Sequence, residues 1–213
     1  MFRIVKCNLF ADGTALELSG MQIAEFKMIG NLNGLQYLYL TANQITAFNP
    51  TIALPISLFY LELSGNQITA FNLKKLPDNL QYLLLGGNQL ITFDYTKQFP
   101  TNLLYLDISY NQITYFNPTT ALPIGLKYLY LSGNQLTLLN PSIPFPVSLR
   151  HLEISNNQFT NAGYSASEPW ANAMTYIANR GAIISFNNSN TNSINGTSLK
   201  SILMSKGWTI LSN

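Results

Sequence analysis

The stretch "LQYLYLTANQITAF" (residues 35–48) combines alternating leucines with a single asparagine, and a close copy, "LFYLELSGNQITAF", occupies residues 58–71. Asn43 in the first copy has the same place as Asn66 in the second. This asparagine position recurs along the chain in steps of 22 or 23 residues, at Asn43, Asn66, Asn88, Asn111, Asn134 and Asn157. A fixed period of this length indicates a solenoid of stacked repeats.

The alternating leucines and the recurring asparagine of the phrase each have a physical explanation. Leu38 and Leu40 point to one side of a strand while Tyr37 and Tyr39 point to the other, so only one face is apolar. One such strand cannot bury its leucines, whereas a stack of them forms a parallel sheet over a continuous core. Where the chain turns inward after each strand, buried backbone groups need hydrogen-bond partners. An asparagine side chain offers both an acceptor and donors, which predicts a structural ladder made by the asparagines at the recurring position.

The phrase matches the pattern LxxLxLxxNxL six times and resembles the leucine-rich repeat, and the prolines before several copies, as in LPxxLxxLxLxxNxL, resemble its bacterial type. The ending "SLKSILMSKGWTI" (198–210) resembles endings in proteins of bacteria and their phages. An earlier, degenerate copy, "LELSGMQIAEF" (16–26), has Met21 in place of the asparagine, which gives seven repeats over residues 13–162. The resemblance implies a right-handed solenoid with a parallel sheet on its concave side and a function in protein–protein interaction. The predicted fold class is therefore an α/β repeat that is mostly β.

The other half of each repeat is predicted to be extended rather than helical, because proline removes a backbone donor and clashes with the preceding turn. These prolines are Pro55, Pro77, Pro100, Pro123 and Pro146. An aromatic column is expected to form an inner spine of Phe26, Phe48, Phe71, Phe93 and Phe116, continued by Leu139.

Both ends of the array depart from the repeat, as a cap requires. Residues 1–12 are predicted to form a cap strand that turns back near Asp12–Gly13 as a β-hairpin. Residues 163–213 are predicted to form a helix–strand–helix–strand cap. Its elements are a helix capped by Ser167 and running over 168–181, a strand over 182–186, a helix over 198–206 and a strand over 208–211.

The outward positions of the strands are the candidate binding surface. A row of tyrosines runs beside four of the nine acidic residues, and tyrosine is favoured at interfaces. The candidates are Tyr37, Tyr39, Tyr60, Glu62, Tyr82, Tyr105, Asp107, Tyr128, Tyr130, His151 and Glu153. They suit a protein, peptide or glycan of basic or polar character. The alternative is that the tyrosines only stack on one another at the strand spacing of ~4.8 Å. For the carboxylates both explanations stay open, because charges ~10 Å apart repel weakly and would gain little structurally.

Catalysis has little support. Cys7 and His151 are the only cysteine and histidine, and six strand steps would separate them by ~29 Å, too far for a nucleophile–base pair. A zinc site needs about four nitrogen or sulfur ligands. Glu62 and Asp107 are ~10 Å apart by strand spacing, on a face that implies no pocket. No catalytic residue, metal or cofactor is therefore predicted.

Composition narrows the partner and the compartment. The 213 residues are 47% hydrophobic and 9% charged, with a net charge of +2 and scattered cations, which argues against nucleic acid as the partner. No signal peptide and no apolar stretch of ~18 residues is evident, so a cytoplasmic or virion location is expected, without membrane insertion. The leading hypothesis is protein or peptide recognition. A structural or decorating component of a larger particle, such as a phage virion, is the alternative, and a surface adhesin is a weaker one.

Overall fold

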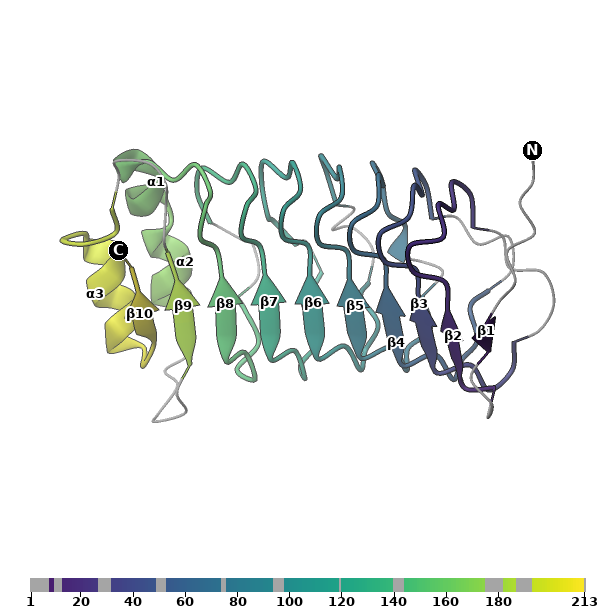
Figure 1. Cartoon of the computed structure of the whole chain (residues 1–213). Helices are drawn as coiled ribbons and strands as arrows, with labels where there is room; N and C mark the ends of the chain where they lie inside the picture. Colours follow the sequence, from purple (N-terminus) through teal and green to yellow (C-terminus); the bar gives the residue numbers. More distant parts are fainter. Residues whose placement is uncertain are drawn as a thin grey trace.

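The structure, a computed structural model, shows ten strands that lie side by side in one sheet in the order of the chain (Figure 1). It describes residues 8–9, 13–26, 32–48, 53–73, 76–93, 98–118, 120–139, 144–174, 182–186 and 193–212. The repeat strands are β2 (Ala15–Glu17), β3 (Tyr37–Tyr39), β4 (Tyr60–Glu62), β5 (Tyr82–Leu84), β6 (Tyr105–Asp107), β7 (Tyr128–Tyr130) and β8 (His151–Glu153).

The first strand runs against the others. β1 (Asn8–Leu9) pairs antiparallel with β2, with Leu9 opposite Leu16. Gly13, with φ of 71°, lies on the way into β2 in a backbone conformation that favours glycine. The predicted turn residue Asp12 and most of the predicted cap strand over 1–12 lie outside the described residues.

From β2 to β10 every neighbouring pair of strands is parallel and in register. Leu38 of β3 lies opposite Leu61 of β4, and both leucines are fully buried. The central residue of each repeat strand is buried in the same way, at Leu16, Leu38, Leu61, Leu83, Leu106, Leu129 and Leu152. This confirms the predicted parallel solenoid, because equivalent leucines of successive repeats stack into one core.

The asparagines connect each repeat to the one before it. The Asn111 amide donates to the carbonyls of Leu85 at 3.0 Å, Ile108 at 3.1 Å and Ser109 at 2.9 Å. Its Oδ1 accepts from the Leu90 backbone N–H at 2.9 Å. The other asparagines at this position, Asn43, Asn66, Asn88, Asn134 and Asn157, make the same kinds of contact. All six are buried, so these side chains supply the partners that the buried turns need.

Phenylalanine rings form a second column inside the solenoid. Phe48 and Phe71 stack with centroids 6.0 Å apart, and Phe71 and Phe93 stack at 6.2 Å. Phe93 also stacks on Phe99 at 5.9 Å. In the described parts of the segments that connect β2 to β8 there is no α-helix, as the prolines predict.

The C-terminal end is built differently from the prediction. Two short helices, α1 (Asn161–Ala166) and α2 (Glu168–Ala173), replace the single helix predicted over 168–181. The extended backbone of Met174 ends α2, and residues 175–181 lie outside the described residues. Ser167 does not cap α2 with its side chain. Its hydroxyl instead donates to Gly163 O at 2.7 Å and accepts from Leu139 N at 2.9 Å.

The rest of this cap follows the expected order. β9 (Ile183–Ser185) and β10 (Thr209–Leu211) extend the parallel sheet, and α3 (Ser198–Ser205) lies between them in the chain. The three helices gather at the C-terminal end of the sheet (Figure 1). Thr197 caps α3 by accepting from the Lys200 N–H at 3.3 Å. Within the described residues, no helix is long and apolar enough to span a bilayer.

Candidate binding surface

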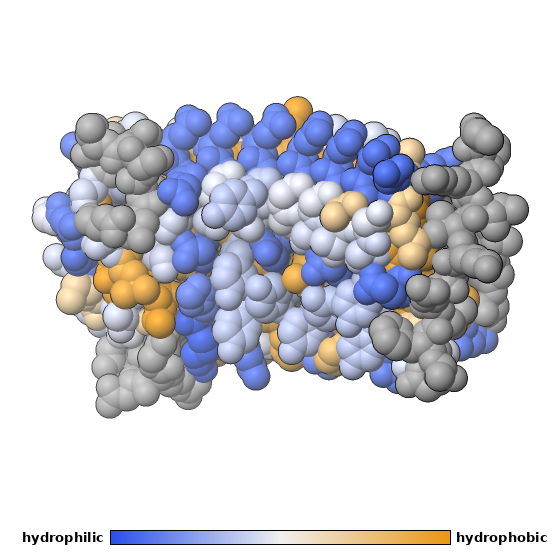
Figure 2. All heavy atoms as spheres, in the orientation of Figure 1, coloured by the Kyte–Doolittle hydropathy of each residue, from blue (hydrophilic) through white to orange (hydrophobic). Residues whose placement is uncertain are grey.

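The first and third residues of β2–β8 point away from the core and form what we call the sheet face. The strand pairing places the first residues in one column, at Ala15, Tyr37, Tyr60, Tyr82, Tyr105, Tyr128 and His151. The third residues form the other column, at Glu17, Tyr39, Glu62, Leu84, Asp107, Tyr130 and Glu153. Figure 2 shows this face: moderately polar side chains cover the strands, and a hydrophilic ridge runs above them along the solenoid. The structure thus brings the predicted binding residues into two neighbouring columns.

The tyrosines of the first column lean on one another. Neighbouring ring centroids are 6.2 Å apart for Tyr37 and Tyr60, 5.6 Å for Tyr60 and Tyr82, 5.9 Å for Tyr82 and Tyr105, and 5.8 Å for Tyr105 and Tyr128. The planes of these pairs are tilted by 30° to 38°. Because each ring covers part of its neighbour, the row offers ring edges and hydroxyls more than open ring faces. The stacking itself also stabilises the sheet.

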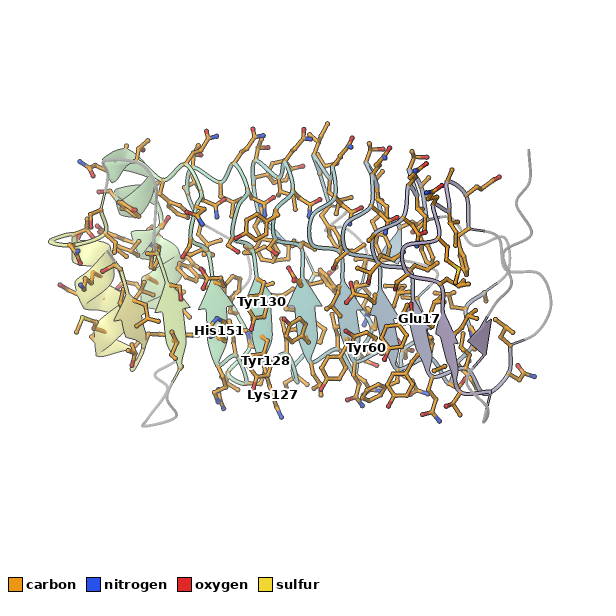
Figure 3. The ribbon with its side chains drawn as sticks, in the orientation of Figure 1. Glu17, Tyr60, Lys127, Tyr128, Tyr130 and His151 are labelled. Carbon is orange, nitrogen blue, oxygen red and sulfur yellow. The ribbon has the colours of Figure 1, made fainter. Side chains whose placement is uncertain are left out.

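Aromatic side chains of the second column contact the first column at two places. Tyr39 lies 5.3 Å from Tyr60 at one end. At the other end Tyr130 lies 5.0 Å from Tyr105 and 5.1 Å from His151, and Figure 3 shows Tyr128, Tyr130 and His151 next to one another. The sheet face therefore has an aromatic group at each end.

Phe59 belongs to the first of these groups, although sequence reasoning missed it. It lies immediately before β4, 5.8 Å from Tyr37 and 5.3 Å from Tyr82. The strand alternation assigns it to the buried side, yet it is only half-buried, because the chain is still turning into the strand at that point. The sequence did contain a signal for this contact, because an aromatic residue stands directly before Tyr60, the first residue of β4.

Burial is the main cause of a raised pKa at four of the tyrosines, which are Tyr39, Tyr60, Tyr105 and Tyr130. The pKa of Tyr60 is raised further by the negative charge of Glu62 and by the hydrogen bond that its hydroxyl donates to the Glu62 carboxylate at 3.2 Å. The pKa of Tyr105 is raised further by its neighbour Tyr130. These hydroxyls therefore stay protonated at neutral pH, and the single proton of Tyr60 is donated to Glu62.

These shifts predict a loss of stability in alkali. A tyrosine with a raised pKa in the folded state stabilises that state fully below the unfolded pKa of about 10, and the stabilisation falls as pH rises above that value. We expect the urea midpoint to fall above about pH 10, with part of the tyrosinate absorbance at 295 nm appearing only on unfolding. Tyr60→Phe should show a smaller alkaline loss than the wild type. An equal loss in both proteins would contradict the assignment of the shift to Tyr60.

The four carboxylates of the second column share one contact that sequence reasoning missed. Each accepts a hydrogen bond from the backbone N–H of the serine two residues later in its own repeat. The distances are 2.7 Å for Glu17, 2.9 Å for Glu62, 2.8 Å for Asp107 and 3.1 Å for Glu153. These carboxylates therefore do gain a structural partner, contrary to the argument from charge spacing. The same contact fixes the position of each negative charge.

The arrangement offers little for catalysis. His151 Nε2 lies 3.9 Å from Glu153 Oε2, while Glu62 and Asp107 are held on β4 and β6 with β5 between them. Among the described residues, no three His, Cys, Asp or Glu side chains gather where they could hold a metal ion. Cys7 lies outside the described residues, so its predicted separation from His151 stays a prediction.

Tyr110 is a further exposed aromatic residue that the strand pattern does not mark. It directly precedes Asn111, with φ of 51°, in the left-handed region where Gly65, Gly87 and Gly133 occupy the equivalent positions. Its side chain is 61% exposed, and its ring lies over Gly133, where an added Cβ would be 2.5 Å from the ring carbon Cδ1. The missing side chain of Gly133 thus makes room for this ring.

Comparisons with known proteins agree with this architecture. Leucine-rich repeat family models match residues 78–136 and 147–166. The solved structure of YopM from Yersinia enterocolitica WA-314 is similar to this chain at 27% identity and a TM-score of 0.55, over 69% of this chain and 29% of YopM. The leucine-rich repeat domain of a Shigella effector is similar at 25% identity and a TM-score of 0.53, over 74% of this chain and 75% of that domain.

YopM of Yersinia pestis, described as a leucine-rich effector protein, shares the fold at 23% identity and a TM-score of 0.54, over 68% of this chain and 44% of that protein. The chain therefore spans less than half of either YopM structure. No curated protein matches the sequence.

Proposed function

The repeats of this chain are leucine-rich repeats, and we propose that they form a non-enzymatic module that binds a protein or peptide partner on the sheet face. Proteins with this fold generally act as interaction modules. The observation that carries the proposal is the row of tyrosines from Tyr37 to Tyr128, half-buried except for the exposed Tyr128, beside carboxylates with fixed positions. Such a surface combines rigid aromatic area with polar tips, as protein interfaces do.

The chemistry of the sheet face indicates the kind of partner. The tyrosine hydroxyls stay protonated and offer polar oxygens, and the carboxylates of Glu62, Asp107 and Glu153 accept hydrogen bonds and attract cations. A partner with basic and polar groups complements this surface. The similarity to bacterial effector proteins supports the same general class of function.

The test is to remove the centre of the tyrosine row. In Tyr60→Ser/Tyr82→Ser/Tyr105→Ser, we expect loss of the partner that the wild type captures from its source cell, as measured by affinity purification and mass spectrometry. The control is Tyr115→Ser, because Tyr115 is an exposed tyrosine outside the strands. Far-UV circular dichroism checks that both variants keep the fold. Unchanged capture by a folded triple variant would refute binding through this row.

A different surface favours a second candidate function, a structural component of a larger particle. Ile56 and Ile124, each directly after a repeat proline, are 81% and 82% exposed, and Val147 at the equivalent position is 51% exposed. Exposed apolar side chains of this size suit a permanent contact with another subunit. This candidate would be favoured if the triple tyrosine variant still co-purified in fixed stoichiometry with other subunits while Ile124→Ser and Val147→Ser did not.

A further inference from the structure

The third residues of the strands alternate in chemistry from one repeat to the next. Along the sheet face, every second strand carries a carboxylate and each strand between them carries an aromatic or apolar side chain. The order from β2 to β8 is Glu17, Tyr39, Glu62, Leu84, Asp107, Tyr130 and Glu153. We call this row the alternating column. Its period is two strands, whereas the sequence repeat has a period of one strand.

The carboxylates of the alternating column are held in place by the protein. Asp107 Oδ1 accepts from the Ser109 N–H at 2.8 Å and from the Ser109 hydroxyl at 2.5 Å. Glu62 is held from both sides, by the Ser64 N–H at 2.9 Å and by the Tyr60 hydroxyl at 3.2 Å. The negative charges therefore recur at a fixed separation of two strand spacings, about 9.6 Å.

Among the described residues, no lysine or arginine forms an ion pair with this column. Its last carboxylate has a basic neighbour, with His151 Nε2 3.9 Å from Glu153 Oε2. Arg150 lies just before β8, where its Nη1 donates to the carbonyls of Val147 at 2.7 Å and Leu149 at 2.9 Å. Figure 3 places Lys127 at the lower edge of the sheet, beyond Tyr128. Both cations thus lie beside the first residues of their strands and away from the third residues.

The separation of the charges matches a known backbone period. A polyproline II segment rises about 3.1 Å per residue with three residues per turn, so every third side chain returns to the same face after about 9.3 Å. We propose that the sheet face binds an extended polyproline II segment with Lys or Arg at every third position, which runs across the strands and places one cation over each carboxylate. This inference rests on the proposed function and names the partner chemistry of the same surface.

The residues between the cations have their own contacts. Tyr39, Leu84 and Tyr130 occupy the strands between the carboxylates and offer apolar surface to the two intervening residues of each turn. Prolines at those positions fit this surface, and they also pre-set the extended backbone, which lowers the entropy lost on binding. A segment of about ten residues spans the ~29 Å from Glu17 to Glu153.

Two peptides of identical composition test the spacing. The probes are fluorescein-labelled KPPKPPKPPK, with lysine at every third position, and its isomer KPKPPPPKPK. We expect the first to bind the wild-type chain at least about 10-fold more tightly than the second in fluorescence anisotropy at low salt, a difference of about 1.4 kcal/mol. Equal affinities, or no saturable binding of KPPKPPKPPK, would overturn the inference.

Matched variants test the site. Glu62→Gln/Asp107→Asn removes two charges while keeping the side-chain shapes, and it should weaken binding of KPPKPPKPPK by about 10-fold or more. Asp78→Asn removes an exposed charge in the turn before β5 and should leave the affinity unchanged. Tight peptide binding that is insensitive to the Glu62/Asp107 variant would also overturn the inference. The proposed function is judged separately, because capture of the natural partner depends on the tyrosine variant and not on these peptides.

Discussion

Replacing Asn111 by alanine should lower the free energy of unfolding by about 3–5 kcal/mol, among the largest effects expected of any single substitution in this chain. Asn111 is only 7% exposed, and its side chain serves backbone groups of two consecutive repeats. How much stability is lost depends on which of those backbone groups keep a second hydrogen-bond partner.

The carbonyls in the asparagine ladder are shared. Leu85 O accepts from both Asn88 and Asn111, and Ile108 O accepts from both Asn111 and Asn134, so each keeps one donor when Asn111 is removed. The Leu90 N–H instead has the Asn111 oxygen as its acceptor. Without that oxygen, a buried donor loses its hydrogen bond, which costs about 1–3 kcal/mol beyond the lost amide bonds.

Gln112→Ala is the matched control for this prediction. Gln112 is the next residue in the chain, its side chain is exposed, and its backbone N–H bonds to Leu90 O independently of the side chain. We expect this variant to stay within about 0.5 kcal/mol of the wild type in urea unfolding. If Asn111→Ala lost no more stability than Gln112→Ala, the ladder would not be the main link between repeats.

The repeats themselves could be predicted almost completely from the sequence, because each position of the repeat occurs in several copies. Leu38 and Leu61 occupy the same place in consecutive phrases, and a parallel in-register sheet is the arrangement that buries both. The asparagine could be assigned to the interior for a similar reason. A polar residue that recurs among buried leucines must satisfy buried backbone groups.

The C-terminal cap was less predictable because each of its residues occurs only once. Local signals favoured Ser167 as the start of one long helix, since Glu168 and Pro169 follow it. In the structure, Ser167 is fully buried and bonds to Leu139 of the sixth repeat, a tertiary contact that no local pattern reveals. Thr160 caps α1 instead, through a hydrogen bond from the Gly163 N–H at 3.1 Å.

For the candidate surface, alternation predicted which side chains face outward but not what they contact. The carboxylate of Glu62 could be placed on the sheet face from its strand position. Its hydrogen bonds to Ser64 and Tyr60 depend on side-chain conformation, which the sequence pattern does not determine. The exposed ring of Tyr110 was missed for a related reason, because its left-handed backbone is a property of the turn.

Replacing Phe93 by alanine should lower the free energy of unfolding by about 3–5 kcal/mol, the second large effect expected here. Phe93 is 2% exposed and stacks between Phe71, at 6.2 Å, and Phe99, at 5.9 Å. Alanine would leave a cavity in the middle of the solenoid and remove both ring contacts, each worth about 0.5–1.5 kcal/mol beyond the buried area.

The sixth repeat supplies the control for Phe93. Leu139 occupies the equivalent position there and is buried, so the spine accommodates leucine at that place. Phe93→Leu should therefore lose clearly less stability than Phe93→Ala, within about 1.5 kcal/mol of the wild type. Equal losses for the two variants would show that the cavity is not the cause.

The two tryptophans make the same experiment a test of cooperativity along the array. Trp170 and Trp208 both lie in the C-terminal cap, so their fluorescence reports the unfolding of that end, whereas far-UV circular dichroism reports the whole chain. Because each repeat shares its asparagine bonds with the next, we expect Phe93→Ala to lower the urea midpoint of both signals equally. A fluorescence midpoint that stayed at the wild-type value would show that the cap unfolds independently of the central repeats.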